Sequence, residues 1–272
     1  MPTVTIRALT VADLPACLDL AVDREWQPEE RKWRLLLEAG EAFGIDDPGG
    51  GLAGAVVLTR YGGGLAAVGM MLVAARREGR GLGRRLMTHV LGRAGDATVF
   101  LTATPLGRPL YEKLGFRAIG ALTTYIGRFG GAPADVSRPA EAADLEAIVA
   151  LDAAAYGAER SGLLRRYLAL AEQVRVVERD GAVVAYAAAS AGASWTTIGP
   201  VIGGGAGLIA DLAARAEGDV RLDLDHRFGD LRAFAAAHGL AAGDSVTLMV
   251  HGERELPGDR DRVTTPMMMA VG

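Results

Sequence analysis

Arginines and glycines lie close together in VAARREGRGLGRRLM at residues 73–87, between an apolar run and a segment with helical spacing. A glycine-rich turn that leads from a strand into a helix leaves several backbone N–H groups unpaired at the positive end of the helix dipole. The glycines let the backbone approach an anion, and the arginines around them are Arg76, Arg77, Arg80, Arg84 and Arg85. This pattern favours phosphate binding, with a solvated, arginine-rich helix start as the alternative.

Spacing excludes two common phosphate-binding motifs. A P-loop needs a lysine and then a serine or threonine directly after its last glycine, and no lysine follows these glycines. A dinucleotide-binding fold needs a third glycine where Leu86 stands, and an acidic residue at the end of the next strand, where ATVFLTAT at 97–104 has none. The remaining candidate is the diphosphate of coenzyme A.

Two stretches resemble one enzyme family. MLVAARREGRGLGRRLM at 71–87 resembles the acetyl-CoA-binding motif of the GNAT superfamily of N-acetyltransferases, and LYEKLGFRAIG at 110–120 resembles the closing helix and strand of that family. A faint internal repeat relates TIRALTVADLPACLDL at 5–20 to VSRPAEAADLEAIVAL at 136–151. The whole chain is therefore similar to tandem GNAT proteins with a degenerate second copy.

The resemblance implies a set of cofactor-binding residues. The backbone amides of residues 79–84 would hold the diphosphate, and the pantetheine arm would run along the strand that precedes the turn. The residues expected to bind acetyl-CoA are Met71, Leu72, Val73, Arg77, Gly79, Arg80, Gly81, Leu82, Gly83 and Arg84. Glu78 stands where the family has arginine or glutamine, so we expect either that Glu78 faces solvent or that Arg77 takes its place.

Acetyl transfer to an amine requires a neutral nitrogen, stabilisation of the oxyanion and a proton for the leaving thiolate. By the resemblance, Tyr111 is the general acid, and the backbone N–H of Met71 or Leu72 polarises the thioester carbonyl. A phenol is protonated at neutral pH and can donate to a sulfur of comparable basicity. The alternative for Tyr111 is an aromatic ring packed on the core face of its helix.

The sequence offers several candidates for the general base. The segment VDREWQPEERKW at 22–33 lies where the family places the helices that cover the acceptor, and it offers Glu25, Glu29 and Glu30. We select Glu25; the alternatives are an exposed, salt-bridged helix, a water chain, and the carboxylate of Gly272 at the end of the apolar stretch TTPMMMAVG. Trp26 and Trp33 would wall an organic substrate.

These residues need an α+β fold with a mixed, mostly antiparallel sheet and flanking helices. In the first half we expect strands at 3–8, 41–46, 53–60, 65–73, 97–103 and 116–128, and helices at 11–23, 28–39, 82–94 and 107–114. The glycine-rich segment 127–135 would link an N-terminal GNAT domain at 1–130 to a C-terminal degenerate domain at 135–272.

The second half repeats the order strand, glycines, helix in IGPVIGGGAGLIADLAARA, without arginines near the turn. Where Tyr111 would repeat, the second half has alanine or phenylalanine. We therefore predict that this copy does not bind coenzyme A productively. Tyr156 and Arg160 would face an acceptor cleft between the halves, with core packing of Tyr156 as the alternative.

Composition limits the possible partners and the compartment. The formal net charge of -4 gives no reason to expect a nucleic-acid partner. Cys17 is the single cysteine, which fits a cytoplasmic protein, and the four histidines lack the spacing of a metal site. No segment indicates a membrane span.

We expect an acyl-CoA-dependent N-acyltransferase that acetylates a small-molecule or peptide amine; the alternative is a coenzyme A-binding regulatory protein without turnover. The acceptor and the oligomeric state stay open.

Overall fold

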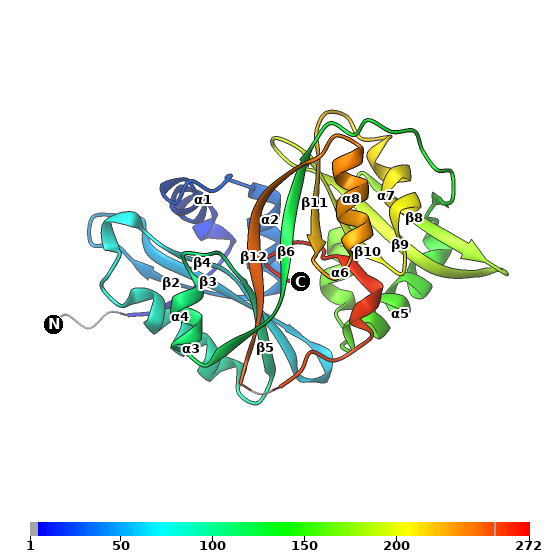
Figure 1. Ribbon diagram of the computed structural model, residues 1–272. Coiled ribbons are helices and arrows are strands. Elements are labelled where there is room, and N and C mark those ends of the chain that lie inside the picture. The colour runs from blue at the N-terminus through cyan, green and yellow to red at the C-terminus, as the bar shows by residue number, and fades with distance from the viewer. Residues whose placement is uncertain (1–4, 253) are drawn as a thin grey trace.

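The computed structural model describes residues 5–252 and 254–272. The chain forms two lobes of similar construction that share one 13-stranded sheet, and two long strands cross between the lobes at the centre of the molecule (Figure 1). We call residues up to 130 the first half and residues from 135 the second half. The α+β class with a mixed sheet and flanking helices is confirmed. No helix in the described part of the chain is long and apolar enough to span a membrane.

The first half follows the predicted order of elements. It contains β1 (Arg7–Leu9), α1 (Leu14–Asp23), α2 (Glu30–Ala39), β2 (Glu41–Asp46), β3 (Leu52–Tyr61), β4 (Leu65–Val73), α3 (Leu82–Ala94), β5 (Thr98–Ala103), α4 (Arg108–Glu112) and β6 (Phe116–Gly127). Part of the first predicted strand, at 3–8, lies outside the described residues. The predicted helix at 11–23 divides into a short 3-10 turn, capped by Thr10, and α1.

The second half repeats this order. It contains β7 (Arg138–Pro139), α5 (Leu145–Tyr156), α6 (Ser161–Leu168), β8 (Gln173–Arg179), β9 (Ala182–Ala191), β10 (Thr196–Ile202), α7 (Ala206–Ala213), β11 (Val220–Asp225), α8 (Gly229–Ala237), β12 (Ala241–His251) and an additional short strand β13 (Val263–Thr265). Each element from β7 to β12 therefore has a counterpart between β1 and β6.

The two closing strands are exchanged between the halves. The order of neighbouring strands at the centre is β4, β5, β12, β6, β11, β10. β12 pairs antiparallel with β5, β6 pairs antiparallel with β11, and the exchanged strands pair with each other, Leu122 opposite Val246. The predicted strand at 116–128 is present as β6, but β12 of the second half, and not β6, pairs with β5. The two closing strands are similar, so each fits the position beside the other half.

β4 and β5 diverge after a short parallel pairing. They pair only from Leu65 to Ala67, and β4 then carries a bulge against β3, within which Met70 adopts a left-handed φ of 51°. From Val68 onward, the edge of β4 that faces β5 therefore has no strand partner. β10 and β11 diverge in the same way after pairing at Thr196 and Thr197.

One segment near the C-terminus lies in both gaps of the sheet, the one where β10 and β11 diverge and the one where β4 and β5 diverge. β13 pairs antiparallel with β10 beyond the point where β11 leaves it. Further along, Thr102 Oγ1 on β5 donates to the Met269 carbonyl at 2.8 Å. On β4, Gly69 is tightly covered, because a Cβ there would lie 2.3 Å from the Ala270 carbonyl oxygen. The segment thus crosses the first half beside the bulge of β4.

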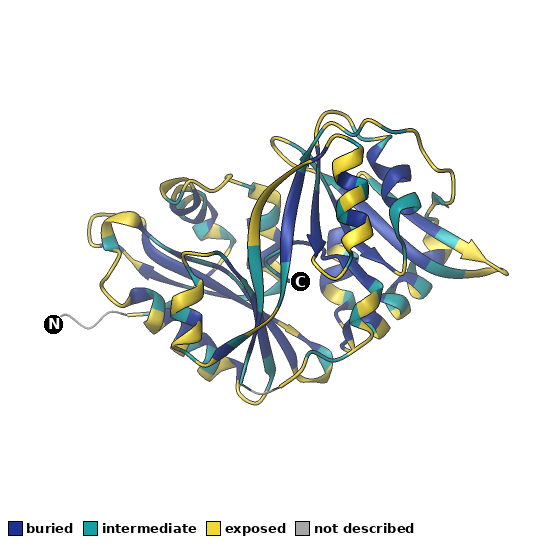
Figure 2. Cartoon of the chain, in the orientation of Figure 1, coloured by how far each residue is buried: buried dark blue, intermediate teal, exposed yellow. Residues whose placement is uncertain are grey.

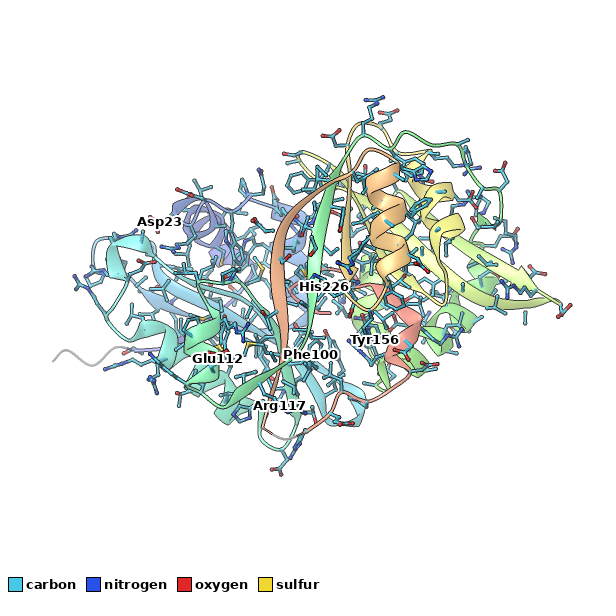
Figure 3. The ribbon with its side chains drawn as sticks, in the orientation of Figure 1. Asp23, Phe100, Glu112, Arg117, Tyr156 and His226 are labelled. Carbon is cyan, nitrogen blue, oxygen red and sulfur yellow. The ribbon has the colours of Figure 1, made fainter. Side chains whose placement is uncertain are left out.

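The largest buried cluster joins the halves around this segment (Figure 2). Tyr156 and Arg160 are fully enclosed in it, so they do not face a cleft, and of the two predicted alternatives core packing is correct. Arg160 forms a bidentate ion pair with Asp152 at 2.7 and 2.9 Å and donates to the Gly272 carbonyl at 3.0 Å. Figure 3 shows Tyr156 of α5 together with Phe100 of β5 in this region.

Candidate active site

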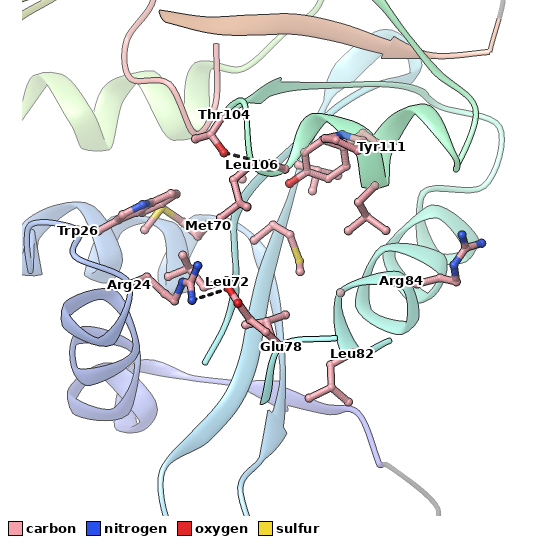
Figure 4. A pocket seen from close by; sticks show the side chains of 18 of the residues that line it. Arg24, Trp26, Met70, Leu72, Glu78, Leu82, Arg84, Thr104, Leu106 and Tyr111 are labelled. Atoms are coloured by element: carbon pink, nitrogen blue, oxygen red, sulfur yellow. Dashed lines mark hydrogen bonds and ion pairs between the residues drawn. The ribbon is translucent and has the colours of Figure 1, made fainter. Parts of the chain in front are cut away.

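A cavity of about 610 Å³ opens where β4 and β5 diverge (Figure 4). It is lined by β4, the turn after it, the start of α3, α4, the loop after α1, and residues 269–270. The structure brings together these residues of the predicted site: Met71, Leu72, Val73, Arg77, Gly79, Gly81, Leu82, Gly83, Arg84 and Tyr111. Arg80 and Glu25 of the predicted set are exposed and are not among the lining residues.

The turn presents a run of free backbone donors to this cavity. In the described part of the chain, the N–H groups of residues 79–84 have no hydrogen-bond partner, and the first bond of the helix runs from Arg85 N to Gly81 O at 3.1 Å. Gly79 and Gly81 have φ values of 70° and 75°, which side chains rarely adopt. Free N–H groups at a helix start, with the positive end of the helix dipole, suit a diphosphate.

Gly83 sets how closely α3 approaches the rest of the cavity. A Cβ at this position would lie 3.1 Å from both Leu110 Cδ2 and Met71 Cε. Glycine therefore allows the first turn of α3 to pack directly against the side chains of α4 and β4, which keeps the free N–H groups beside the strand opening.

Two of the arginines fix the turn instead of facing a ligand. The Asp47 carboxylate has a fully buried side chain and accepts hydrogen bonds from Arg76 at 2.9 Å and from Arg77 at 2.6 and 2.9 Å. The bonds from Arg77 and from the Gly49 backbone hold the pKa of Asp47 well below its usual range. In the described residues, Arg84 has no carboxylate within ion-pair distance, and its guanidinium points away from the centre of the cavity in Figure 4.

Arg24, at the end of α1, forms an ion pair with Glu78. The Glu78 carboxylate lies 2.7 Å from Arg24 Nη1, and the Glu78 side chain is 56% exposed. Arg77 does not take the place of Glu78, because Asp47 engages it. Sequence analysis missed Arg24, and the signal for it is weak, because a basic residue at the end of a helix occurs in many proteins.

Tyr111 packs in the core and also lines the cavity. Its ring is 7% exposed and packs edge-to-face against Phe116, with ring centroids 5.9 Å apart. Its hydroxyl points into the cavity in Figure 4, and no hydrogen-bond partner for it exists in the described residues. Burial raises the pKa of Tyr111 to about 12, so the phenol keeps its proton at neutral pH.

The predicted general bases lie away from the cavity. Glu25 is exposed in a left-handed turn, Glu29 pairs with Lys32, and Glu30 pairs with Arg34 at 2.9 Å. Gly272 is buried beside Arg160 and does not line the cavity. Of the two predicted aromatic walls, Trp26 lines the cavity, but Trp33 is completely buried in the core; that part of the prediction is wrong.

Further lining residues come from segments far apart in the sequence. Thr102 and Thr104 lie on and just after β5, and Met269 and Ala270 come from the segment that enters the strand opening. The second half thus supplies part of the wall of the first half's cavity. The apolar run PMMMA was the only sequence signal for this wall. In the described residues, no group of histidine, cysteine and acidic side chains could hold a metal ion.

The corresponding place in the second half differs. Gly203, Gly204 and Gly205 alone connect β10 to α7, whereas the turn after β4 spans residues 74–81. The cavity of about 540 Å³ beside these glycines contains Arg227, which is paired with Asp225 and Asp261. In the second half, β13 pairs with β10. In the first half, the corresponding edge of β4 has no such strand and borders the open cavity.

Comparison with known proteins finds relatives for both halves. A family model described as an acetyltransferase (GNAT) domain matches residues 24–126, and a second model with the same description matches residues 148–264. An uncharacterised N-acetyltransferase of Bacillus subtilis, YitH, is 27% identical over 254 residues, which cover 89% of each chain.

Solved structures show the same fold over the whole chain. A candidate acetyltransferase from Pyrococcus horikoshii superimposes with a TM-score of 0.84 at 17% identity, covering 100% of this chain and 97% of that chain. A tandem GNAT protein from the clavulanic acid biosynthesis pathway gives a TM-score of 0.67 at 16% identity, covering 93% and 100%. The tandem arrangement is therefore confirmed.

Proposed function

We propose that this chain, which belongs to the GNAT acetyltransferase family with two such domains in tandem, transfers the acetyl group of acetyl-CoA to an amine of a small molecule or peptide. The observation that carries the proposal is the run of free N–H groups at residues 79–84, directly beside the unpaired edge of β4. A diphosphate bound at the turn would leave the pantetheine arm in reach of that edge, where it can pair like an added strand.

Residues that line the cavity would carry out the chemical steps of acetyl transfer. The thioester supplies an activated acetyl group. The amine nitrogen attacks its carbonyl carbon, the carbon–sulfur bond breaks, and Tyr111 donates a proton to the departing sulfur. The nitrogen gives up one proton to water, from which Tyr111 regains its own, so the charges balance. The backbone N–H of Met71 or Leu72, on the bulged strand, is our candidate for polarising the carbonyl oxygen.

A coenzyme A-binding regulatory protein without turnover is the second candidate. It is favoured by Glu78, a carboxylate inside the phosphate turn, which lowers affinity for an anion. The ion pair with Arg24 offsets this effect, and the Tyr111 hydroxyl in the cavity supports catalysis; we therefore prefer the enzyme.

Calorimetric titration with acetyl-CoA tests whether the glycine turn is the cofactor-binding site. The test variant carries Gly81→Val and Gly83→Val, since the first position needs a left-handed backbone and a Cβ at the second would crowd the side chains of Leu110 and Met71 at 3.1 Å. The matched control is Gly92→Val, on the exposed face of the same helix, where a Cβ meets nothing within 4 Å. We expect binding to the wild type and the control, and loss in the test variant. Absence of binding to the wild type contradicts the proposal.

We also propose that the second half keeps the fold without the cofactor site, because β13 fills the opening beside β10. The same titration measures this, since one acetyl-CoA per chain is expected. Two equivalent sites contradict it.

A further inference from the structure

A second cavity, of about 540 Å³, lies between the two halves. Its walls are the first turns of α2, the end of α6, the loop between β9 and β10, and residues 267–268. Large apolar side chains line it from both halves: Leu35, Leu170, Met267 and Met268. Leu170 is 44% exposed although it is large and apolar, so this cavity offers an apolar surface that solvent can reach.

The charged residues around this cavity neutralise one another. Lys32 pairs with Glu29 on the same turn of α2. Arg31 pairs with Glu172 of the second half at 3.1 Å, and Glu30 pairs with Arg34 at 2.9 Å. Because each carboxylate here has a cationic partner, the rim does not select for a polycation.

The apolar wall holds one isolated polar group. The Ser190 hydroxyl is buried and has no hydrogen-bond partner of good geometry in the described residues, since its neighbour Tyr167 donates to the Gly199 carbonyl at 2.7 Å. A charge placed against this apolar wall would lose hydration without gaining a partner.

The second cavity adjoins the first at α2 and at the C-terminal segment. The Lys32 side chain lines both cavities, and successive residues of the segment divide between them, Met268 in the second and Met269 in the first. Lys32 and the C-terminal segment therefore form the boundary between the two cavities, and an acceptor that extends past Lys32 would reach from the thioester position to the space between the halves.

We infer that the second cavity binds the body of the acceptor, and that this acceptor is a primary amine on an uncharged aliphatic or aromatic body. The inference rests on the proposed function and adds the class of substrate. It gives the second half a role in binding, since Leu170 would contact the acceptor directly.

Direct binding tests the ligand class independently of turnover. The probe is dansyl-1,5-diaminopentane, a primary amine with an uncharged aromatic body whose fluorescence rises in apolar surroundings. The variant is Leu170→Glu, which places a charge in the cavity at a half-exposed position. The matched control is Val136→Glu, an exposed apolar residue that lines neither cavity. We expect the probe to bind the wild type and the control, and to bind the variant about tenfold more weakly.

Steady-state transfer then separates the inference from the proposed function. With acetyl-CoA, we expect phenethylamine to be a better substrate than spermidine, and Leu170→Glu to raise the KM for phenethylamine without changing the Kd of acetyl-CoA. Preferred transfer to spermidine, or probe binding that is unchanged by Leu170→Glu, would overturn the inference and leave the proposed function intact. Probe binding without any acetyl-CoA binding would overturn the proposed function instead.

Discussion

Arg24 Nη1 and Glu78 Oε1 lie 2.7 Å apart and join the end of α1 to the glycine turn at the rim of the first cavity. The only carboxylate among the described residues that line this cavity is therefore neutralised by the opposite wall. Both side chains are partly exposed, so the pair contributes modestly to stability, but it decides the charge that a bound diphosphate meets.

Replacing Glu78 removes that negative charge. We expect Glu78→Gln to tighten acetyl-CoA binding about threefold, because an exposed charge near an anion has an effect of roughly 0.5 to 1 kcal/mol. Arg24→Ala should weaken binding by a similar factor, since it leaves Glu78 unpaired. Calorimetry on both single variants and on the double variant measures the coupling, and unchanged affinity in all of them would place the diphosphate elsewhere.

Removing the phenol of Tyr111 should affect catalysis and spare binding. We expect Tyr111→Phe to lower kcat about 10²-fold while the Kd of acetyl-CoA stays the same, because a general acid contributes in the transition state only. Free-thiol release and calorimetry provide the two readings. Equal kcat in both proteins would exclude Tyr111 as the acid.

The pH profile gives a separate check on Tyr111. Its pKa of about 12 means that the protonated, donating form persists to high pH. We expect the kcat of the wild type to show no loss from deprotonation of Tyr111 between pH 7 and 10. An alkaline limb near pH 9 that disappears in Tyr111→Phe would show that the phenol titrates lower than its burial implies.

Asp47 links the turn to stability at low pH. Its folded-state pKa is depressed, so its contribution is complete above the unfolded-state pKa and is lost as pH falls below about 4. We expect Asp47→Asn to lower Tm at pH 7, with a difference from wild type that shrinks between pH 4 and pH 2. Thermal scans at both ends of this range measure it, and a constant difference would mean that the carboxylate charge does not stabilise the turn.

Gly69 tests how firmly the C-terminal segment sits in the opening of β4 and β5. A Cβ at Gly69 would overlap the Ala270 carbonyl, so we expect Gly69→Ala to destabilise the protein by about 1 to 3 kcal/mol. Gly92→Ala, in the last turn of α3, should stabilise it by about 0.5 to 1 kcal/mol. Denaturant titration distinguishes the two, and equal effects would show that the segment moves aside easily.

The parts of the site that could be predicted are local in sequence. The glycine turn at 79–84 and Tyr111 belong to short motifs whose conformation depends on neighbouring residues, and their arrangement follows once a strand leads into a helix. Arg24, Met269 and the exchanged strands depend on contacts between distant segments. β6 and β12 are both closing strands that follow a short helix, so the order of elements along the chain does not show which partner each strand takes.

The strand exchange constrains how the protein is made and how its gene can change. During synthesis, the first half can form its glycine turn early, but the edge of β5 stays open until β12 has been made, which leaves an unpaired strand edge for other chains to join. A deletion of the second copy would remove β12 from the first. The sheet of the first half is thus completed by a strand of the second half.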